Sequence, residues 1–199
     1  MTPAHDVAPL GPRFANALAF AAQVHATQTR KGKPTPYVAH LLAVAALVIE
    51  YGGDEDTAIA ALLHDAPEDQ GGRPMLERIR ACFGDRVAGI VDECTDTYAD
   101  PKEPWHPRKE AYIGSIPHKS AEGLLVSLAD KVHNAREILE DYKQDGEAIW
   151  SRFNAGRADL LRYYRRLTEA FRGRTPDRLW QHLEETVIEL EKLTGAKAS

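Results

Sequence analysis

Apolar residues recur at intervals of three and four along nearly the whole chain, and no segment shows the alternation of apolar and polar residues that is typical of a half-buried strand. The pattern therefore predicts an all-α protein, a bundle of about eight to ten helices. The expected helices cover about residues 12–27, 37–51 and 54–65, short stretches near 75–83 and 85–93, a long stretch that opens near 120, and stretches near 147–152, 154–171 and 176–193.

The second of these helices has an apolar face that should point into the core. On that face lie Val38, Leu41, Leu42, Ala45 and Val48. The pair Gly52-Gly53 should end the helix, and Asp54 then stands at the position of an N-cap for the third helix. The loop before the second helix, residues 30–36, is basic and contains glycine and proline.

The third helix leads into an unusual run of polar residues. His64-Asp65 follows an Ala/Leu stretch directly, and Glu68 and Asp69 come within one more turn. Burying an unpaired carboxylate or imidazole is costly, so such a cluster is expected where a cation or a substrate satisfies it. Pro67 lacks an amide hydrogen and disfavours helical geometry in the residue before it. The helix should bend or stop there, with His64-Asp65 on its last turn and Glu68 and Asp69 on the bend or just past it.

Two later segments also carry informative polar residues. Residues 95–107 contain three prolines among polar residues, so this stretch is expected to be a long loop, and such loops are often functional. Ser120 should open a long helix on which Asp130 and Asn134 stand four residues apart and share one face.

Length and composition are those of an ordinary globular domain. The chain has 199 residues, of which 43% are hydrophobic and 28% charged, and nothing in the composition requires a second core. We expect one domain over residues 1–199, with a core of about residues 13–171, a C-terminal helix at about 176–194 and frayed ends. The N-terminal residues are not typical of a secretory signal, and the presence of only two cysteines, Cys82 and Cys94, favours the cytoplasm.

The charge distribution narrows the possible partners. A formal net charge of -5 argues against a general nucleic-acid binder, and no apolar run approaches the ~20 residues that span a membrane. Two basic clusters interrupt this acidic chain: Arg30, Lys31 and Lys33, and Lys102, Arg108 and Lys109. Either cluster can be a solvated loop or can capture an anion. Only the neighbouring motifs decide between these two interpretations, and the sequence is silent on oligomeric state.

Four residues on three expected helices form a candidate metal site. They are His40, His64, Asp65 and Asp130. Two imidazoles and two carboxylates suit a divalent ion such as Mn²⁺ or Fe²⁺. A bound ion of this kind lowers the pKa of its water and so supplies the nucleophile that phosphoester hydrolysis needs at neutral pH. For His40 alone, a histidine packed on an amphipathic helix is the competing interpretation, and for His25 packing is favoured over ligation.

Three segments carry a resemblance to a known family. They are Arg30-Lys31-Gly32-Lys33-Pro34-Thr35-Pro36-Tyr37-Val38-Ala39-His40, then Leu62-Leu63-His64-Asp65 followed by Glu68-Asp69, and Leu128-Ala129-Asp130-Lys131 followed by Asn134. In this order and at these separations they resemble the signature blocks of the HD-type hydrolase domain of the RelA/SpoT family, and the likeness extends roughly from Phe14 to Tyr164. The short stand-alone hydrolases of that family, which lack the alarmone synthetase domain, are the nearest type.

The resemblance implies a role for particular residues. The metal ligands, usually of one Mn²⁺ with Fe²⁺ or another divalent ion as the alternative, would be His40, His64, Asp65 and Asp130. Glu68 and Asp69 match the acidic pair that orients or deprotonates the attacking water. Arg30 and Lys31 match residues that contact the phosphates of the substrate, and Asn134 matches one that helps to hold the nucleotide.

The resemblance also implies an activity. Members of the family remove the 3′-pyrophosphate from guanosine tetra- or pentaphosphate, (p)ppGpp. The alternatives are hydrolysis of another nucleotide, such as ppApp, the 2′-phosphate of NADPH or a deoxynucleoside monophosphate, and a silent protein that only binds the alarmone. Tyr163 and Arg157 are further candidates, for stacking on the base and holding a phosphate, although packing in the core is the competing interpretation for Tyr163.

Overall fold

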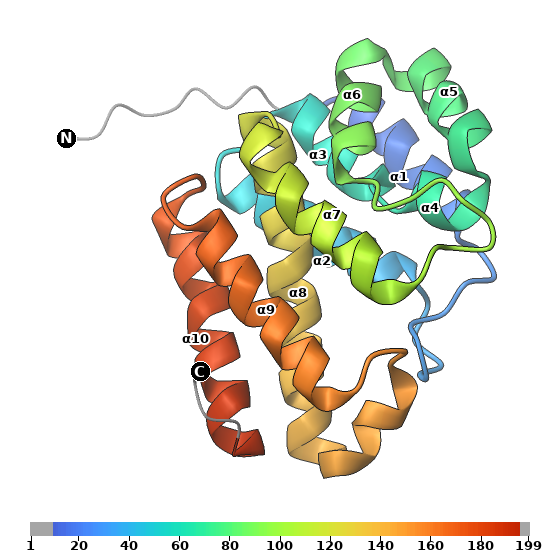
Figure 1. Ribbon diagram of the computed structural model, residues 1–199. Helices are drawn as coiled ribbons and strands as arrows, with labels where there is room; N and C mark the ends of the chain where they lie inside the picture. The colour runs from blue at the N-terminus through green and yellow to red at the C-terminus, as the bar shows by residue number, and fades with distance from the viewer. Residues whose placement is uncertain (1–9, 196–199) are drawn as a thin grey trace. The chain divides into compact units, whose positions relative to one another are not determined.

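The computed structural model describes residues 10–195, and the N-terminal residues considered above and the tail after 195 lie outside this range. Within residues 10–195 the regular elements are ten α-helices and two 3₁₀-helices, and no strand forms (Figure 1). The all-α class is therefore confirmed. The chain divides between Lys102 and Glu103 into two compact units. A single domain over the whole chain stays a prediction.

The first unit is built around a buried helix, α3. Its helices are α1 (Pro12–Val24), α2 (Val38–Glu50), α3 (Glu55–Leu63), α4 (Ala66–Gln70), α5 (Gly72–Phe83) and α6 (Asp85–Cys94). α3 packs against α1, α2 and α6, and seven of its nine residues are buried. Asp54 caps α3 as predicted, because its Oδ1 accepts hydrogen bonds from the Thr57 amide at 3.0 Å and the Thr57 hydroxyl at 2.6 Å.

Helix α3 ends earlier than the sequence predicted. α3 ends at Leu63, so His64 and Asp65 form the turn after the helix instead of its last turn. Pro67 lies in the first turn of α4, where its missing amide hydrogen costs nothing. Glu68 and Asp69 therefore stand on a new short helix just past the turn, which is one of the two positions predicted for them.

The predicted inner face of α2 needs one correction. Leu41, Ala45 and Val48 are buried, but Leu42 is 44% exposed and Val44 is fully buried. Apolar residues surround α2 on most sides, so the spacing of apolar residues does not by itself select the buried face.

The second unit consists of α7 (Trp105–Ser115), η1 (Ile116–His118), α8 (Ala121–Asp145), η2 (Gly146–Arg152), α9 (Arg157–Phe171) and α10 (Asp177–Thr194). The long helix α8 packs along α10, which also packs on α9. Ser120 caps α8 as predicted, since its hydroxyl accepts a hydrogen bond from the Gly123 amide at 3.0 Å. Among the described residues, no helix is both long and apolar enough to cross a membrane.

The expected loop at 95–107 is shorter than predicted. α7 begins at Trp105, so only residues 95–104 are irregular. Pro107 falls in the first turn of α7, where proline is tolerated because the amide hydrogens of that turn have no partner within the helix.

Candidate active site

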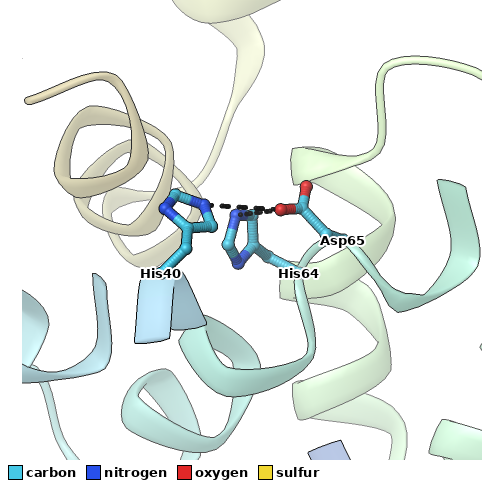
Figure 2. A group of neighbouring side chains, drawn as sticks. All are labelled: His40, His64 and Asp65. Atoms are coloured by element: carbon cyan, nitrogen blue, oxygen red, sulfur yellow. Dashed lines mark ion pairs between the residues drawn. The ribbon is translucent and has the colours of Figure 1, made fainter. Parts of the chain in front are cut away.

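Two histidines and an aspartate of the first unit bring their ligand atoms together. His40 lies in the first turn of α2, and His64 and Asp65 form the turn after α3. Their candidate ligand atoms all lie within 4.8 Å of one another. Asp65 Oδ2 is 3.5 Å from His40 Nε2 and 3.1 Å from His64 Nε2, so one carboxylate oxygen faces both rings (Figure 2).

Both imidazoles are buried and suited to binding a metal ion. His40 is 1% exposed and His64 is 3% exposed. His64 Nδ1 lies 2.8 Å from the carbonyl oxygen of Ala61. Because a carbonyl can only accept, Nδ1 carries the hydrogen and Nε2 keeps its lone pair for a ligand. Two imidazole nitrogens and a carboxylate oxygen are a donor set that fits a divalent metal ion.

Tyr37, at the end of the loop before α2, contacts the cluster of His40, His64 and Asp65 through a hydrogen bond. Its hydroxyl donates to Asp65 Oδ2 at 2.6 Å, the same oxygen that faces the two histidines. The Tyr37 ring stacks on the His25 ring with the centroids 5.2 Å apart. His25 is 3% exposed and lies outside the group of converging ligand atoms, in agreement with the packing role expected for it.

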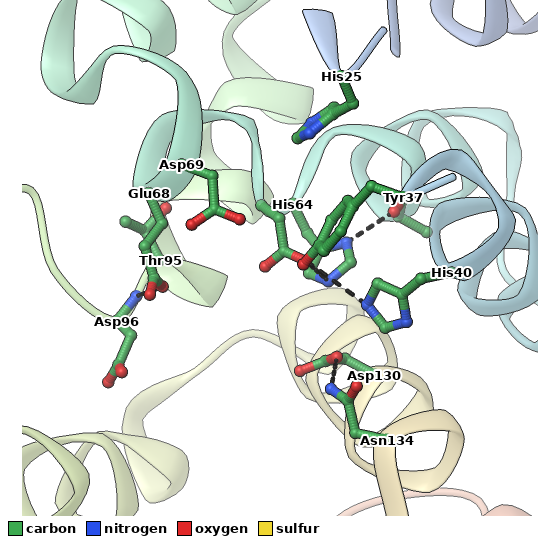
Figure 3. Close-up of polar contacts among 12 residues, drawn as sticks. His25, Tyr37, His40, His64, Glu68, Asp69, Thr95, Asp96, Asp130 and Asn134 are labelled. Carbon is green, nitrogen blue, oxygen red and sulfur yellow. Dashed lines mark hydrogen bonds and ion pairs between the residues drawn. The ribbon is translucent and has the colours of Figure 1, made fainter. Parts of the chain in front are cut away.

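The fourth predicted ligand, Asp130, belongs to the second unit. It is 7% exposed on α8, where Lys131 Nζ donates to its Oδ2 at 2.6 Å and the Asn134 amide donates to its Oδ1. The predicted pairing of Asp130 and Asn134 on one helix face is therefore confirmed as a hydrogen bond (Figure 3). Burial would lower the pKa of Lys131, but the charge of Asp130 outweighs it and holds that pKa well above its usual value. The place of Asp130 in a ligand set with His40 and His64 stays a prediction.

The acidic pair on α4 is held at all four of its carboxylate oxygens. Glu68 accepts from Lys102 Nζ at Oε1 (2.7 Å) and from the Asp96 amide at Oε2 (3.3 Å; Figure 3). Asp69 accepts from Lys102 Nζ at Oδ1 (2.9 Å) and from Gln28 Nε2 at Oδ2 (2.9 Å). These donors come from the loop after α1 and from residues 95–104, so two loops fix the orientation of the pair.

The orientation of the Gln28 amide is determined by its neighbours. Its oxygen accepts from Gln70 Nε2 at 2.6 Å and lies 2.6 Å from His25 Nδ1. If the amide were reversed, its oxygen would face the Asp69 carboxylate and its nitrogen would face the Gln70 amide nitrogen. The observed orientation therefore makes Gln28 a donor to Asp69 and His25 Nδ1 a donor to Gln28. The sequence analysis missed Gln28, whose position three residues after His25 was the only available signal.

Burial is the largest influence on the Glu68 carboxyl. It raises the pKa of the Glu68 carboxyl, the charge of Asp65 raises it further, and Lys102 acts in the opposite direction. Burial would lower the pKa of Lys102, but Glu68 and Asp69 outweigh it and raise that pKa above its usual value. Lys102 was predicted only as part of a basic cluster, and its contact with both carboxylates was not foreseen.

The basic loop before α2 is folded back on itself. Thr29 and Pro36 form an isolated antiparallel bridge, and the Arg30 amide donates to the Thr35 carbonyl at 2.8 Å. The Arg30 guanidinium lies 5.5 Å from the centroid of the Tyr37 ring. Burial lowers the pKa of Lys31. Arg30 therefore touches the residue that hydrogen-bonds Asp65, while the phosphate contacts expected of Arg30 and Lys31 stay predictions.

The two candidates on α9 have different surroundings. Arg157 donates to Glu147 Oε1 at 3.0 Å on the surface. Tyr163 is 6% exposed, with the Trp105 ring edge-on at 5.6 Å and Lys109 Nζ 5.6 Å from its centroid. Its packing agrees with the alternative given for it, and the substrate contacts of Arg157 and Tyr163 remain predictions.

Comparison with known proteins identifies the family. The model of the HD domain family matches residues 17–161. The chain belongs to this family. The predicted resemblance to an HD-type domain is thereby confirmed. An HD domain implies a divalent metal ion, and in the first unit of this HD domain His40, His64 and Asp65 form the site that fits it.

Two relatives of this HD domain carry the name guanosine-3′,5′-bis(diphosphate) 3′-pyrophosphohydrolase MESH1. The protein from Xenopus tropicalis is 43% identical and that from Homo sapiens 38% identical, each over 122 residues. Each alignment covers 60% of this chain and 65% of the relative, so the match spans just under two thirds of the length of these curated relatives.

The HD domain also resembles a solved structure. That protein is described as a metazoan ortholog of SpoT that hydrolyzes ppGpp and plays a role in starvation responses. The two structures align with a TM-score of 0.71 and 28% sequence identity, over 94% of this chain and 98% of the other.

Proposed function

We propose that this HD domain is a metal-dependent phosphohydrolase that removes the 3′-pyrophosphate from guanosine 3′,5′-bis(diphosphate), ppGpp. The observation that carries the proposal is the acidic pair, which begins three residues after Asp65 and is held at every carboxylate oxygen. A pocket that only bound a polyphosphate would gain nothing from two further negative charges. Hydrolysis needs such groups, because they orient water and accept its proton. The names of the relatives support the choice of nucleotide.

The proposed metal ion is Mn²⁺, with Fe²⁺ as the alternative, and its ligands are His40, His64, Asp65 and Asp130. When bound, the ion supplies a nucleophile from water at neutral pH and offsets negative charge on the phosphoryl oxygens. The protein contributes the orientation of the ligands. The bond from His64 Nδ1 to the Ala61 carbonyl directs Nε2, and the Tyr37 hydroxyl holds Asp65 Oδ2.

Glu68 and Asp69 have different roles in the proposed reaction. Glu68 is the proton acceptor, because burial raises its pKa and a stronger base accepts the proton of water more readily. Asp69 is held from one side by Lys102 and from the other by Gln28, so it orients the water.

The remaining residues bind the nucleotide. Arg30 can grip a phosphate through two N–H donors at once, and Lys31 adds a point charge. Asn134, Arg157 and Tyr163 are proposed to hold the nucleoside. The partner is thus a small phosphorylated nucleotide, with no role for nucleic acid or a membrane. The two cysteines form no disulfide, which supports the cytoplasm as the compartment.

Two other functions are open to test. The same site can serve ppApp, the 2′-phosphate of NADPH or a deoxynucleoside monophosphate, although two adjacent cations at Arg30 and Lys31 favour a diphosphate over a monophosphate. A protein that binds the alarmone without cleaving it is the second alternative, and the acidic pair argues against it.

The decisive experiment is a substrate panel. The Mn²⁺-loaded protein is incubated with ppGpp, ppApp, NADPH and deoxynucleoside monophosphates, and the products are identified by chromatography. The proposal expects pyrophosphate and GDP from ppGpp, and no turnover after chelation. If ppGpp stays intact while another nucleotide is consumed, the proposed substrate is wrong and the hydrolase assignment stands.

A matched pair of variants separates catalysis from binding. Glu68→Ala should keep nucleotide binding and lower turnover by about 10²–10⁴-fold, the usual contribution of a general base. Glu77→Ala changes an exposed glutamate on α5 and should leave turnover unchanged. Equal turnover of both variants would show that Glu68 is not the base.

A further inference from the structure

The first unit contains a cleft of about 850 Å³ that starts at the acidic pair. Glu68 and Asp69 line it, together with the start of α5 at residues 71–74 and with the loop residues 98–100 and Lys102. This volume lies in the range of small-molecule binding sites. Glu68 and Asp69, which are proposed to act at the phosphate that is cleaved, therefore form one wall of the cleft. The rest of the cleft has room for a further part of the substrate.

One cation in this cleft is exposed and held in place. The Arg73 guanidinium lies 4.3 Å from the centroid of the Tyr98 ring, and the Tyr98 hydroxyl donates to Asp92. Burial and that hydrogen bond raise the pKa of Tyr98 to about 12, so the ring stays a neutral platform at physiological pH. Within residues 10–195 no carboxylate pairs with Arg73. Its N–H donors are thus available to an anion, and stacking limits the freedom that binding would remove.

The other charged side chains that line the cleft carry a net negative charge, because Glu68, Asp69 and Asp100 outnumber Lys102. Lys102 pairs with both Glu68 and Asp69, so one ammonium offsets half of their charge. Asp100 adds a negative charge to the lining. Anion binding there cannot rest on net charge, and it needs direct contact with Arg73 and Lys102.

The backbone at the start of α5 adds to this wall. Gly71 and Gly72 have positive φ values of 139° and 62°, and α5 has no acidic residue in its first turn and no side-chain cap. A Cβ added to Gly72 would lie 3.6 Å from the Tyr98 carbonyl oxygen and would need the left-handed conformation as well. The uncapped amides and the positive end of the helix dipole therefore supplement the side-chain cations.

We propose that this cleft is a diphosphate subsite in which Arg73 grips a phosphoryl group with two N–H donors while Lys102 contacts the phosphate nearer the acidic pair. The inference rests on the proposed hydrolysis at Glu68 and Asp69. When a phosphoryl group reacts beside the acidic pair, the other phosphoryl group of the same diphosphate lies next to the cleft. This holds for a diphosphate that is still joined to the nucleotide and for the released pyrophosphate.

The test uses inorganic pyrophosphate as the probe. Its affinity for the metal-loaded protein is measured by titration calorimetry for the wild type, Arg73→Met and Arg78→Met. Arg78 is the matched control, because it also lies on α5 and stacks on an aromatic ring, Phe20, at 4.7 Å, but it does not line the cleft. Arg73→Met should weaken binding by about tenfold, the effect of losing one charge-assisted two-donor contact, and Arg78→Met should leave it unchanged.

Three further measurements complete the test. Arg73→Lys keeps the charge but loses the two-donor grip, so its affinity for pyrophosphate should fall between those of the wild type and Arg73→Met. The thermal unfolding midpoint of each variant is measured to test whether the fold is intact. The KM for the nucleotide shows which diphosphate the subsite binds. If Arg73→Met loses pyrophosphate affinity and its KM also rises, the subsite binds a diphosphate that is still attached to the substrate. If the KM is unchanged, the subsite binds the released pyrophosphate.

Equal pyrophosphate affinity in the wild type and Arg73→Met would overturn the subsite. This outcome is independent of the proposed function, because pyrophosphate binding requires no turnover. A protein that binds pyrophosphate through Arg73 but cleaves no nucleotide would refute the hydrolysis and keep the subsite.

Discussion

Lys102 Nζ lies 2.7 Å from Glu68 Oε1 and also 2.9 Å from Asp69 Oδ1. One ammonium group from the loop after α6 therefore holds both carboxylates of the acidic pair. The contact joins residues 34 and 33 positions apart, so the loop and the pair keep their positions together. Removal of the ammonium should affect both the protonation and the placement of the pair.

Lys102→Met should shift the acid limb of the kcat/KM profile to higher pH. The charge of Lys102 lowers the pKa of Glu68, against burial and the charge of Asp65, which both raise it. Without the lysine, Glu68 becomes ionised, and so able to act as a base, only at a higher pH. Lys143→Met is the control, because Lys143 pairs with Glu140 and Glu189 on the surface of the second unit. An acid limb at the same pH in both variants would contradict this account.

Gln28→Leu should lower kcat by about 10–100-fold, the usual effect of losing a group that orients a functional carboxylate. Asp69 Oδ2 loses its donor, while none of the converging ligand atoms changes. Metal affinity, measured by competition with a chelator, should stay the same. Gln23→Leu, at an exposed position of α1, provides the comparison. The role assigned to Gln28 is wrong if the two variants have the same kcat.

Tyr37→Phe should weaken metal binding by about 10–100-fold and leave kcat nearly unchanged when the metal ion is saturating. The variant removes only the hydroxyl that donates to Asp65 Oδ2, and the ring can still stack on His25. Tyr142→Phe removes a hydroxyl that donates to the exposed Glu147 and should have no effect on the metal. A kcat loss that excess metal ion does not restore would contradict a role limited to holding Asp65.

Glu68→Gln should raise the thermal unfolding midpoint of the metal-free protein at pH 7. Burial raises the pKa of Glu68 in the folded state, so the folded protein binds this proton more tightly than the unfolded chain does. The stability gained from that proton is complete below the unfolded pKa of glutamate, about 4.3, and is lost as the pH rises through the folded pKa. The advantage of the variant should therefore shrink as the pH is lowered towards 4. A constant difference across this range would rule out protonation of Glu68 as its cause.

The helical class and most helix positions could be predicted because apolar spacing is a local signal. Asp54 and Ser120 cap α3 and α8 as expected from their side chains alone. The missed helix, α7, contains Pro107, which marks a loop in the sequence but is compatible with a first turn. Which side of α2 is buried, with Val44 inside and Leu42 outside, depends on the packing of α2 against α3 and so could not be read from spacing.

The candidate site was predictable where its residues are close together in the sequence. His64, Asp65, Glu68 and Asp69 lie within six residues, and their chemistry is unusual after an apolar run. The groups that hold the acidic pair could not be found this way. Gln28 and Lys102 lie 41 and 33 residues from Asp69, and neither residue type is distinctive on a polar surface. The stacking of Arg73 on Tyr98 depends in the same way on the folded path of a loop.

The burial of α3 has a practical consequence for work on this protein. Seven of the nine residues of α3 are buried, and an N-cap hydrogen bond anchors its start, so packing sets the position of the turn that carries His64 and Asp65. The core therefore positions the ligands of the first unit, and we expect the fold to persist without a bound ion. Metal ions should then be removable and exchangeable in one folded preparation, so that Mn²⁺, Fe²⁺ and other ions can be compared in the same protein without refolding it.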